Sequence, residues 1–142
     1  MMGRRKAAIG VDIGGTKISA GIVGGEGLVY ASPRTIATNP KEPGEVIIAN
    51  LFSLLKNILA DAADYDIQGI GIGCTGPLDI DKGILLDVEN LPTLNYFPLK
   101  DTVEQAFPLR VILDNDANAL IYAEALWGAC LLYTSPSPRD RS

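Results

Sequence analysis

An amphipathic helical repeat between two apolar strands is the feature that most constrains the fold of this chain. From Ile47 to Ala62 the apolar residues recur at spacings of three and four, which is typical of a helix with one buried face. Residues 28–36 before this repeat and residues 67–74 after it have the composition of strands. Because a strand, a helix and a strand in this order form a crossover unit, the sequence predicts an α/β domain with parallel strands.

Strands are also predicted at the start of the chain. Residues 7–13 are mostly apolar and predict a buried strand, and residues 17–23 predict a second one. Residues 24–27, Gly-Gly-Glu-Gly, are strong turn formers, so residues 28–36 become the third strand of a meander. Pro33 lies inside that run. Since proline is tolerated mainly in edge strands, we expect the third strand at the edge of the sheet.

The second half of the chain continues the alternation of strands and helices. Residues 80–97 have no long apolar period and predict a loop region, with room for a short hairpin. A short helix is expected over residues 98–107, with proline at its first position. Its predicted apolar face consists of Leu99, Val103, Ala106 and Phe107. Residues 109–113 predict a fifth strand, and a helix that is apolar nearly all round is expected over residues 116–129.

Composition narrows the class of protein. The 142 residues are 47% hydrophobic and 20% charged, which fits one globular domain. The formal net charge is -5 and the only basic cluster is residues 4–6, so we expect no nucleic acid partner. No run reaches the roughly 18 apolar residues of a membrane span, and no stretch has the pattern of a signal peptide, so we expect no membrane partner.

The titratable side chains exclude further classes of site. Cys74 and Cys130 lie far apart in the sequence and do not form a metal-type pair, which favours a reduced, cytoplasmic protein. The chain contains no histidine. Histidine-based triads and histidine metal sites are therefore excluded within this chain.

A candidate phosphate-binding loop follows the first strand, where residues 12–17 read Asp-Ile-Gly-Gly-Thr-Lys. Glycines at 14 and 15 let backbone N–H groups approach an anion, while Thr16 adds a hydroxyl and Lys17 a positive charge. Asp12 offers a carboxylate that could hold the water shell of a magnesium ion. A plain Gly-Gly hairpin turn with a hydrophilic tip explains the same residues equally well.

Polar loops follow three of the predicted strands, at residues 14–17, 74–79 and 114–118. Ligands of open α/β sheets bind outside the carboxyl ends of the strands, so we expect these loops to converge on one crevice. Residues 71–76 also match the dinucleotide pattern G-x-G-x-x-G. That pattern must open a helix, whereas Pro77 and the residues after it continue as loop or strand, which speaks against nicotinamide or flavin binding.

Asp116 is the candidate for chemistry, because it lies between a predicted strand end and a predicted helix start. A carboxylate there could accept the proton of a substrate hydroxyl as that hydroxyl attacks a phosphorus atom. The alternative is that Asp116 or Asp114 only caps the helix. Asn115 and Asn118 are equally typical of helix caps and of ligands for sugar hydroxyls.

Four motifs together resemble the N-terminal half of a ROK-family protein (repressor, open reading frame, kinase). They are residues 12–17, Gly-Cys-Thr-Gly-Pro-Leu-Asp at 73–79, Asn-Leu-Pro at 90–92 and Asn-Asp-Ala-Asn-Ala at 115–119. Their order and spacing fit the family from residue 7 to about residue 129. Four motifs in register are far more specific than any one of them.

The resemblance implies an actin-like, ribonuclease-H-like α/β domain and the ATP-dependent phosphorylation of a hexose, as in a glucokinase. The residues that would face the ATP phosphates and magnesium are Asp12, Gly14, Gly15, Thr16 and Lys17. The residues that would line the sugar site are Gly76, Asn90, Asn115 and Asp116. Among these, Asp116 would be the general base for the sugar hydroxyl.

The resemblance also divides the chain near residue 129. Residues 1–129 correspond to the N-terminal lobe of family members, which continue with a second domain that often carries a zinc site and that completes the ATP and sugar sites. We therefore expect the fragment by itself to be inactive, any zinc to belong to the missing half, and the full-length parent to be a homodimer. Residues 130–142 are rich in Ser, Pro and Arg, and we interpret them as a non-native or disordered tail.

Two alternatives remain open at this stage. A sugar-responsive transcriptional regulator of the same family would carry an N-terminal winged-helix domain, whereas here the first predicted strand begins at residue 7. A stand-alone phosphate- or nucleotide-binding module is the other alternative.

Overall fold

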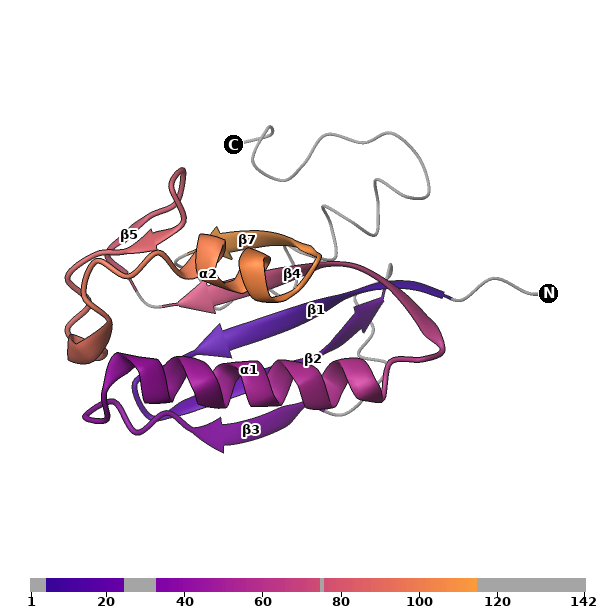
Figure 1. The fold of residues 1–142 in the computed structure, drawn as a ribbon, viewed down its shortest axis with the longest axis horizontal. Helices are drawn as coiled ribbons and strands as arrows, with labels where there is room; N and C mark the ends of the chain where they lie inside the picture. Colours follow the sequence, from indigo (N-terminus) through magenta and orange to yellow (C-terminus); the bar gives the residue numbers. More distant parts are fainter. Residues whose placement is uncertain (1–4, 25–32, 75, 115–142) are drawn as a thin grey trace.

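Strand β1 (Arg5–Ile13) is the central strand of a five-stranded sheet in the order β3-β2-β1-β4-β7. The computed structural model describes three stretches of the chain, residues 5–24, 33–74 and 76–114. On one side of β1, strands β2 (Lys17–Gly24) and β3 (Arg34–Ala37) form an antiparallel meander. On the other side, β4 (Tyr65–Cys74) and β7 (Arg110–Asp114) run parallel to β1 (Figure 1). The predicted α/β class, with a meander beside parallel strands, is confirmed.

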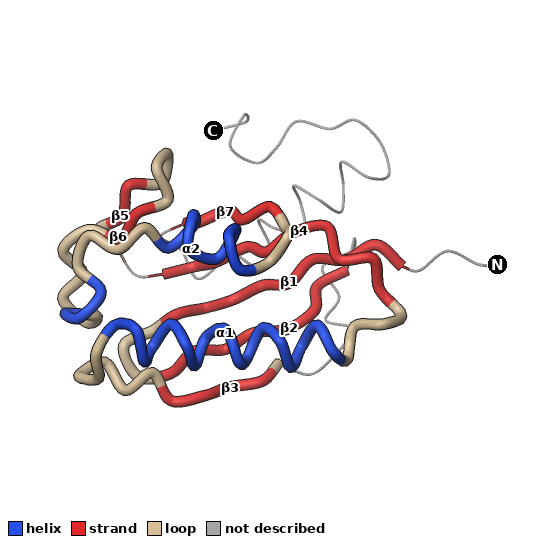
Figure 2. Tube along the Cα trace, viewed as in Figure 1, coloured by secondary structure: helices blue, strands red, loops and turns tan. Residues whose placement is uncertain are grey.

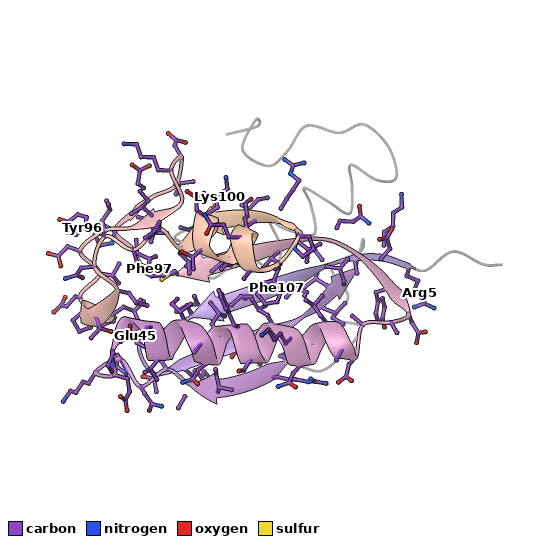
Figure 3. The ribbon with its side chains drawn as sticks, in the orientation of Figure 1. Arg5, Glu45, Tyr96, Phe97, Lys100 and Phe107 are labelled. Carbon is purple, nitrogen blue, oxygen red and sulfur yellow. The ribbon has the colours of Figure 1, made fainter. Side chains whose placement is uncertain are left out.

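Two helices cover one face of this sheet (Figure 2). Helix α1 (Gly44–Ala60) is the predicted crossover from β3 to β4, and Glu45 lies in its first turn, where the helix dipole favours a negative charge. Helix α2 (Leu99–Ala106) leads into β7. The rings of Phe52 and Phe107 meet edge to face with centroids 5.4 Å apart, and Phe107 lies directly over α1 (Figure 3). None of the helices in the described stretches is long and apolar enough to cross a membrane.

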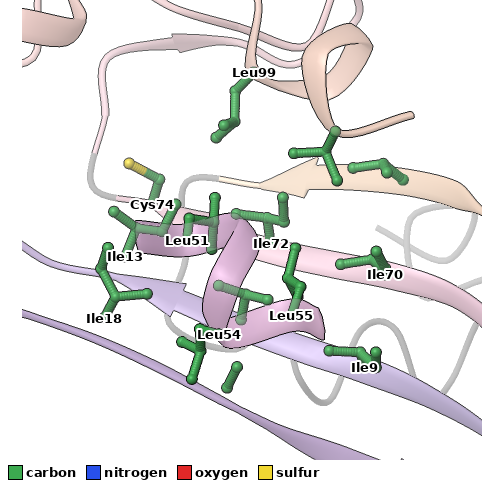
Figure 4. Close-up of a cluster of buried hydrophobic side chains, with 14 of the residues drawn as sticks. Ile9, Ile13, Ile18, Leu51, Leu54, Leu55, Ile70, Ile72, Cys74 and Leu99 are labelled. Atoms are coloured by element: carbon green, nitrogen blue, oxygen red, sulfur yellow. The ribbon is translucent and has the colours of Figure 1, made fainter. Parts of the chain in front are cut away.

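The hydrophobic core lies between the helices and the sheet (Figure 4). Alternate residues of β1 face it and are level with core residues of β4, in the pairs Ile9 with Ile70, Val11 with Ile72, and Ile13 with Cys74. Helix α1 contributes the buried residues Ile47, Ile48, Leu51, Leu54, Leu55 and Ile58. Because side chains alternate along a strand, Asp12 belongs to the opposite face of the sheet.

A short hairpin lies between β4 and α2, and its first strand precedes the range 80–97 in which a hairpin was expected. Strands β5 (Leu78–Asp79) and β6 (Ile84–Leu85) pair antiparallel, and a single 3₁₀ turn, η1 (Pro92–Leu94), follows. Gly83 turns the hairpin with a φ of 70°, and a Cβ at this position would overlap the side chain of Lys100. Glycine is therefore required here.

Some predicted boundaries are corrected by the structure. Strand β3 begins at Arg34, so Pro33 precedes the strand instead of lying inside it, because proline has no N–H to give to the ladder. Ala106 is exposed and was wrongly placed on the apolar face of α2. The helix ends there, and Phe107 fills the core from an extended conformation. Asp114 is the last residue of β7 rather than part of a loop. The helix expected at 116–129 and the tail lie outside the described residues.

Candidate functional site

The loop from Gly14 to Thr16 joins β1 to β2 as a tight hairpin connection. The N–H of Gly14 donates to the carbonyl oxygen of Lys17 at 2.9 Å, and Ile13 pairs with Ile18 just beyond. The hairpin interpretation of these residues is thus correct for the backbone. The side chains of Thr16 and Lys17 are nevertheless exposed, so the same turn leaves a hydroxyl and an ammonium group free to meet an anion.

Thr38, the residue directly after β3, makes two hydrogen bonds to this loop. The hydroxyl of Thr38 donates to the carbonyl oxygen of Gly14 at 2.7 Å, and the N–H of Thr38 donates to the carbonyl oxygen of Thr16 at 2.9 Å. Thr38 is 1% exposed and is the one buried polar residue in the described part of the chain. Sequence reasoning missed it, although a polar residue directly before Asn39 and Pro40, at the end of an edge strand, was a weak local signal.

The carboxyl ends of β1, β4 and β7 are level with one another, and they lie on the left of Figure 1. Asp12 pairs with Gly73, and Gly73 pairs with Asp114, so these two carboxylates belong to the same face with only a glycine between them. The strand ends that carry the first two polar loops are thus level, and the convergence of the loops on one crevice stays a prediction. Of the third loop only Asp114 is described.

Asn90 lies against the phosphate-loop candidate. A Cβ built on Gly15 would be 2.9 Å from the Cβ of Asn90. A hollow of about 380 Å³ opens beside them, lined by Gly15, Thr16, Pro40, Lys41, Glu89, Asn90 and Pro92. One residue expected at the sugar and two expected at the phosphates therefore share a single hollow. Lys41 and Glu89 are additional charged residues of this hollow, and no sequence pattern singled them out.

Gly76 follows the end of β4 at the same edge of the sheet. Its neighbour Pro77 accepts a hydrogen bond from the N–H of Leu86 at 3.1 Å, which ties this turn to the segment that leads to Asn90. Asn115 and Asp116 lie outside the described residues. Their roles stay predictions.

Asp12 occupies a different position from the rest of the loop. It is exposed and lines a second hollow of about 220 Å³, together with Gly10, Ser19, Ala20, Gly21, Val23 and Pro33. Hard carboxylate oxygens suit Mg²⁺, which usually takes one or two carboxylates and keeps several waters. The Cα atoms of Asp12 and Asp114 are two strand spacings, about 10 Å, apart on the same face of the sheet. Within the described stretches no group of three or more Asp, Glu, Cys or His could hold a metal ion.

Cys74 has no role as a nucleophile here. It is buried at the end of β4, and burial, followed by the charge of Asp12, raises the pKa of its thiol to about 12. The thiol is therefore protonated at neutral pH. Its place in the core among Ile13 and its neighbours gives it a packing role (Figure 4).

The fold is an α/β domain in which an antiparallel meander is joined to parallel strands. Polar turns follow the carboxyl ends of the parallel strands, which is the edge where open α/β sheets bind their ligands. This chain belongs to the ROK family, whose profile matches residues 8–134. The resemblance seen in the sequence is confirmed.

Several relatives of this chain are named as sugar kinases. It is 34% identical over 123 residues to the glucokinase of Halalkalibacterium halodurans, a match that covers 85% of this chain and 37% of that protein. It is 33% identical over 116 residues to the N-acetylmannosamine kinase of Escherichia coli K12, covering 82% and 38%. The crystal structure of a ROK family glucokinase from Streptomyces griseus in complex with glucose and AMPPNP superposes with a TM-score of 0.69 at 37% identity, covering 87% of this chain and 38% of that one. The chain thus spans well under half the length of these relatives.

Proposed function

We propose that this chain supplies the first phosphate loop and part of the sugar site of an ATP-dependent hexose kinase of the glucokinase type. The observation that carries the proposal is the contact between Gly15 and Asn90 beside one hollow of about 380 Å³. Phosphoryl transfer requires the attacking hydroxyl and the phosphate to be held next to one another. A loop suited to phosphate and an amide suited to sugar hydroxyls meet that requirement.

Each residue then has a defined task. The N–H groups of Gly15 and Thr16, the hydroxyl of Thr16 and the ammonium of Lys17 bind the phosphates of ATP, while Asn90, Gly76 and Asn115 line the sugar. Asp116 accepts the proton of the sugar hydroxyl. The oxygen of that hydroxyl bonds to the γ-phosphorus while the bond between the γ-phosphorus and ADP breaks. Asp12 is the residue here that would hold the water shell of Mg²⁺, and that ion would offset the negative charge on the phosphates.

Glucose is the proposed sugar, and the complete protein is the proposed enzyme. The glucokinases and the N-acetylmannosamine kinase match this chain at nearly equal identity, 34% and 33%, so the assay must include both sugars. We propose that residues 1–129 belong to the N-terminal lobe of a longer protein and that the 142-residue chain alone has no turnover. Positioning supplies most of the catalysis in phosphoryl transfer, and relatives use a much longer chain for it.

The test is to complete the gene in the 3′ direction and to assay ATP-dependent phosphorylation of glucose, fructose, mannose and N-acetylmannosamine. We expect turnover of at least one sugar and a fall in kcat on the order of 10²- to 10⁴-fold in Asp116→Asn. Asp101→Asn, an exposed carboxylate in the first turn of α2, is the matched control and should keep full activity. No turnover on any sugar would refute the kinase proposal, and full turnover in Asp116→Asn would refute the assigned base.

The alternatives have their own signatures. Glucose binding without turnover by the complete protein would favour a sugar-responsive regulator. Tight binding of Mg-ATP by the 142-residue chain alone, measured by calorimetry, would favour a stand-alone nucleotide-binding module. For a kinase lobe we expect weak or no binding.

A further inference from the structure

We infer that Thr38 is a positioning residue, which turns the peptide groups of the Gly14–Lys17 loop into the orientation that phosphate binding needs. The two hydrogen bonds from Thr38 to this loop are called the Thr38 clamp below. The nature of the ligand rests on the proposed kinase function, whereas the clamp itself rests on the contacts alone.

The clamp uses both donors of one residue. Strand β3 pairs with β2 up to Ala37, which lies opposite Lys17. One residue further on, the N–H of Thr38 reaches the carbonyl oxygen of Thr16 at 2.9 Å and the hydroxyl reaches the carbonyl oxygen of Gly14 at 2.7 Å. Thr38 is 1% exposed, so water cannot easily replace it as the donor.

Peptide planarity converts these bonds into the direction of a loop donor. A trans peptide holds its C=O and its N–H on opposite sides, and the only cis peptide in the described residues is Gly76-Pro77. Since the carbonyl of Gly14 points to Thr38, the N–H of Gly15 points away from Thr38. The carbonyl oxygens of Gly14 and Thr16, which would repel a phosphate, are held towards Thr38 by their hydrogen bonds to it. Gly15 is also the loop residue that lies against Asn90.

The clamp fixes a second wall of the same hollow. Directly after Thr38, Asn39 adopts a φ of 53°, a left-handed conformation that asparagine tolerates better than most residues. This turn brings Pro40 and Lys41 to the hollow that Gly15 and Thr16 line. Loss of the clamp should therefore disturb the phosphate side of the site on both walls.

The decisive comparison uses three variants of the complete protein. Thr38→Val keeps the shape of the side chain and removes the hydroxyl, whereas Thr38→Ser keeps the hydroxyl. Thr102→Val is the matched control, because the hydroxyl of Thr102 also donates to a backbone carbonyl, that of Pro98, at the same 2.7 Å, but in helix α2. The readouts are the KM for ATP, the KM for the sugar, Mg-ATP affinity by calorimetry, and hydrogen exchange of the amides of residues 13–18.

We expect Thr38→Val to raise the KM and the Kd for ATP about tenfold, the effect of one lost hydrogen bond to a poorly solvated carbonyl, with the KM for the sugar within about twofold. Exchange across residues 13–18 should accelerate in Thr38→Val only, and Thr38→Ser should restore both properties. The inference is overturned if Thr38→Val changes the KM for ATP and the KM for the sugar equally and Thr102→Val does the same. Such a result would show that the hydroxyl of Thr38 has a merely structural role. If the complete protein phosphorylates no sugar, the proposed function fails. Loop exchange then still decides, since unchanged exchange in Thr38→Val overturns the clamp and accelerated exchange supports it.

Discussion

Gly15 and Asn90 touch so closely that a methyl group on the glycine would lie 2.9 Å from the Cβ of the asparagine. Contacts that short do not occur between real side chains, so the two segments must separate if Gly15 gains a side chain. The loop after β1 and the turn before η1 therefore fit together only because residue 15 is a glycine. This contact joins two motifs that are 75 positions apart in the sequence.

We predict that Gly15→Ala lowers kcat/KM of the complete protein by about 10- to 100-fold, because overpacking of this size costs about 1–3 kcal/mol. Gly14→Ala is the comparison, since its added methyl would lie 3.3 Å from the carbonyl oxygen of Lys17 and needs only a small shift. Steady-state kinetics of both variants checks the prediction. An equal or larger loss in Gly14→Ala would contradict it.

Asp12→Asn should raise the Mg²⁺ concentration needed for half-maximal activity by about tenfold, because it removes the charge that would hold the metal's water shell. Saturating Mg²⁺ should largely restore the rate. Asp101→Asn serves again as the control on an exposed carboxylate. A Mg²⁺ titration that is unchanged in Asp12→Asn would remove Asp12 from the metal site.

The buried Cys74 predicts a loss of stability in alkali. Its folded pKa of about 12 lies above the ordinary value of 9.0, so the thiol's contribution is fully present below pH 9 and is lost as the pH rises from there to about 12. Over that range the free energy of unfolding should fall by up to about 1.4 kcal/mol per pH unit. Denaturant unfolding of Cys74→Ala, compared with the unmodified protein at pH 8 and pH 10, should show a smaller fall. The folded thiol should also resist iodoacetamide at pH 8, as judged by mass spectrometry of its peptide.

Gly83→Ala should destabilise the complete protein by about 1–3 kcal/mol, since a positive φ and an overlap with Lys100 both oppose a side chain there. Gly21→Ala is the control, because its methyl would meet the Cα of Pro33 at an ordinary 3.4 Å. Chemical denaturation with an unchanged m-value is the measurement. Equal midpoints for the two variants would contradict the prediction.

Apolar runs and helical periodicity were enough to predict the strands and their crossover. The apolar run of residues 7–13 and the spacings within α1 mark elements that are buried, and burial is a local property of the sequence pattern. The Asp-Ile-Gly-Gly-Thr-Lys run likewise marked its own loop, because glycine content signals a tight connection.

Contacts between distant segments were beyond such patterns. Thr38 bonds to a carbonyl 24 positions away, and nothing in the residues around Thr38 records that partner. The same holds for Asn90 beside Gly15 and for Lys41 in their shared hollow. The error at Ala106 has a local cause, because a helical period was extended through a residue where the helix ends.

The hairpin of β1 and β2 restricts the length of the loop between them. Its three residues, Gly14 to Thr16, set the offset between two strands whose side chains alternate between the core and the other face. A change in the loop that shifted the pairing of β2 by one residue would send Ile18, Ala20 and Ile22 out of the core together. The interior of the protein therefore opposes any change of loop length that alters this register, whereas side chains on the turn can be exchanged without disturbing the core.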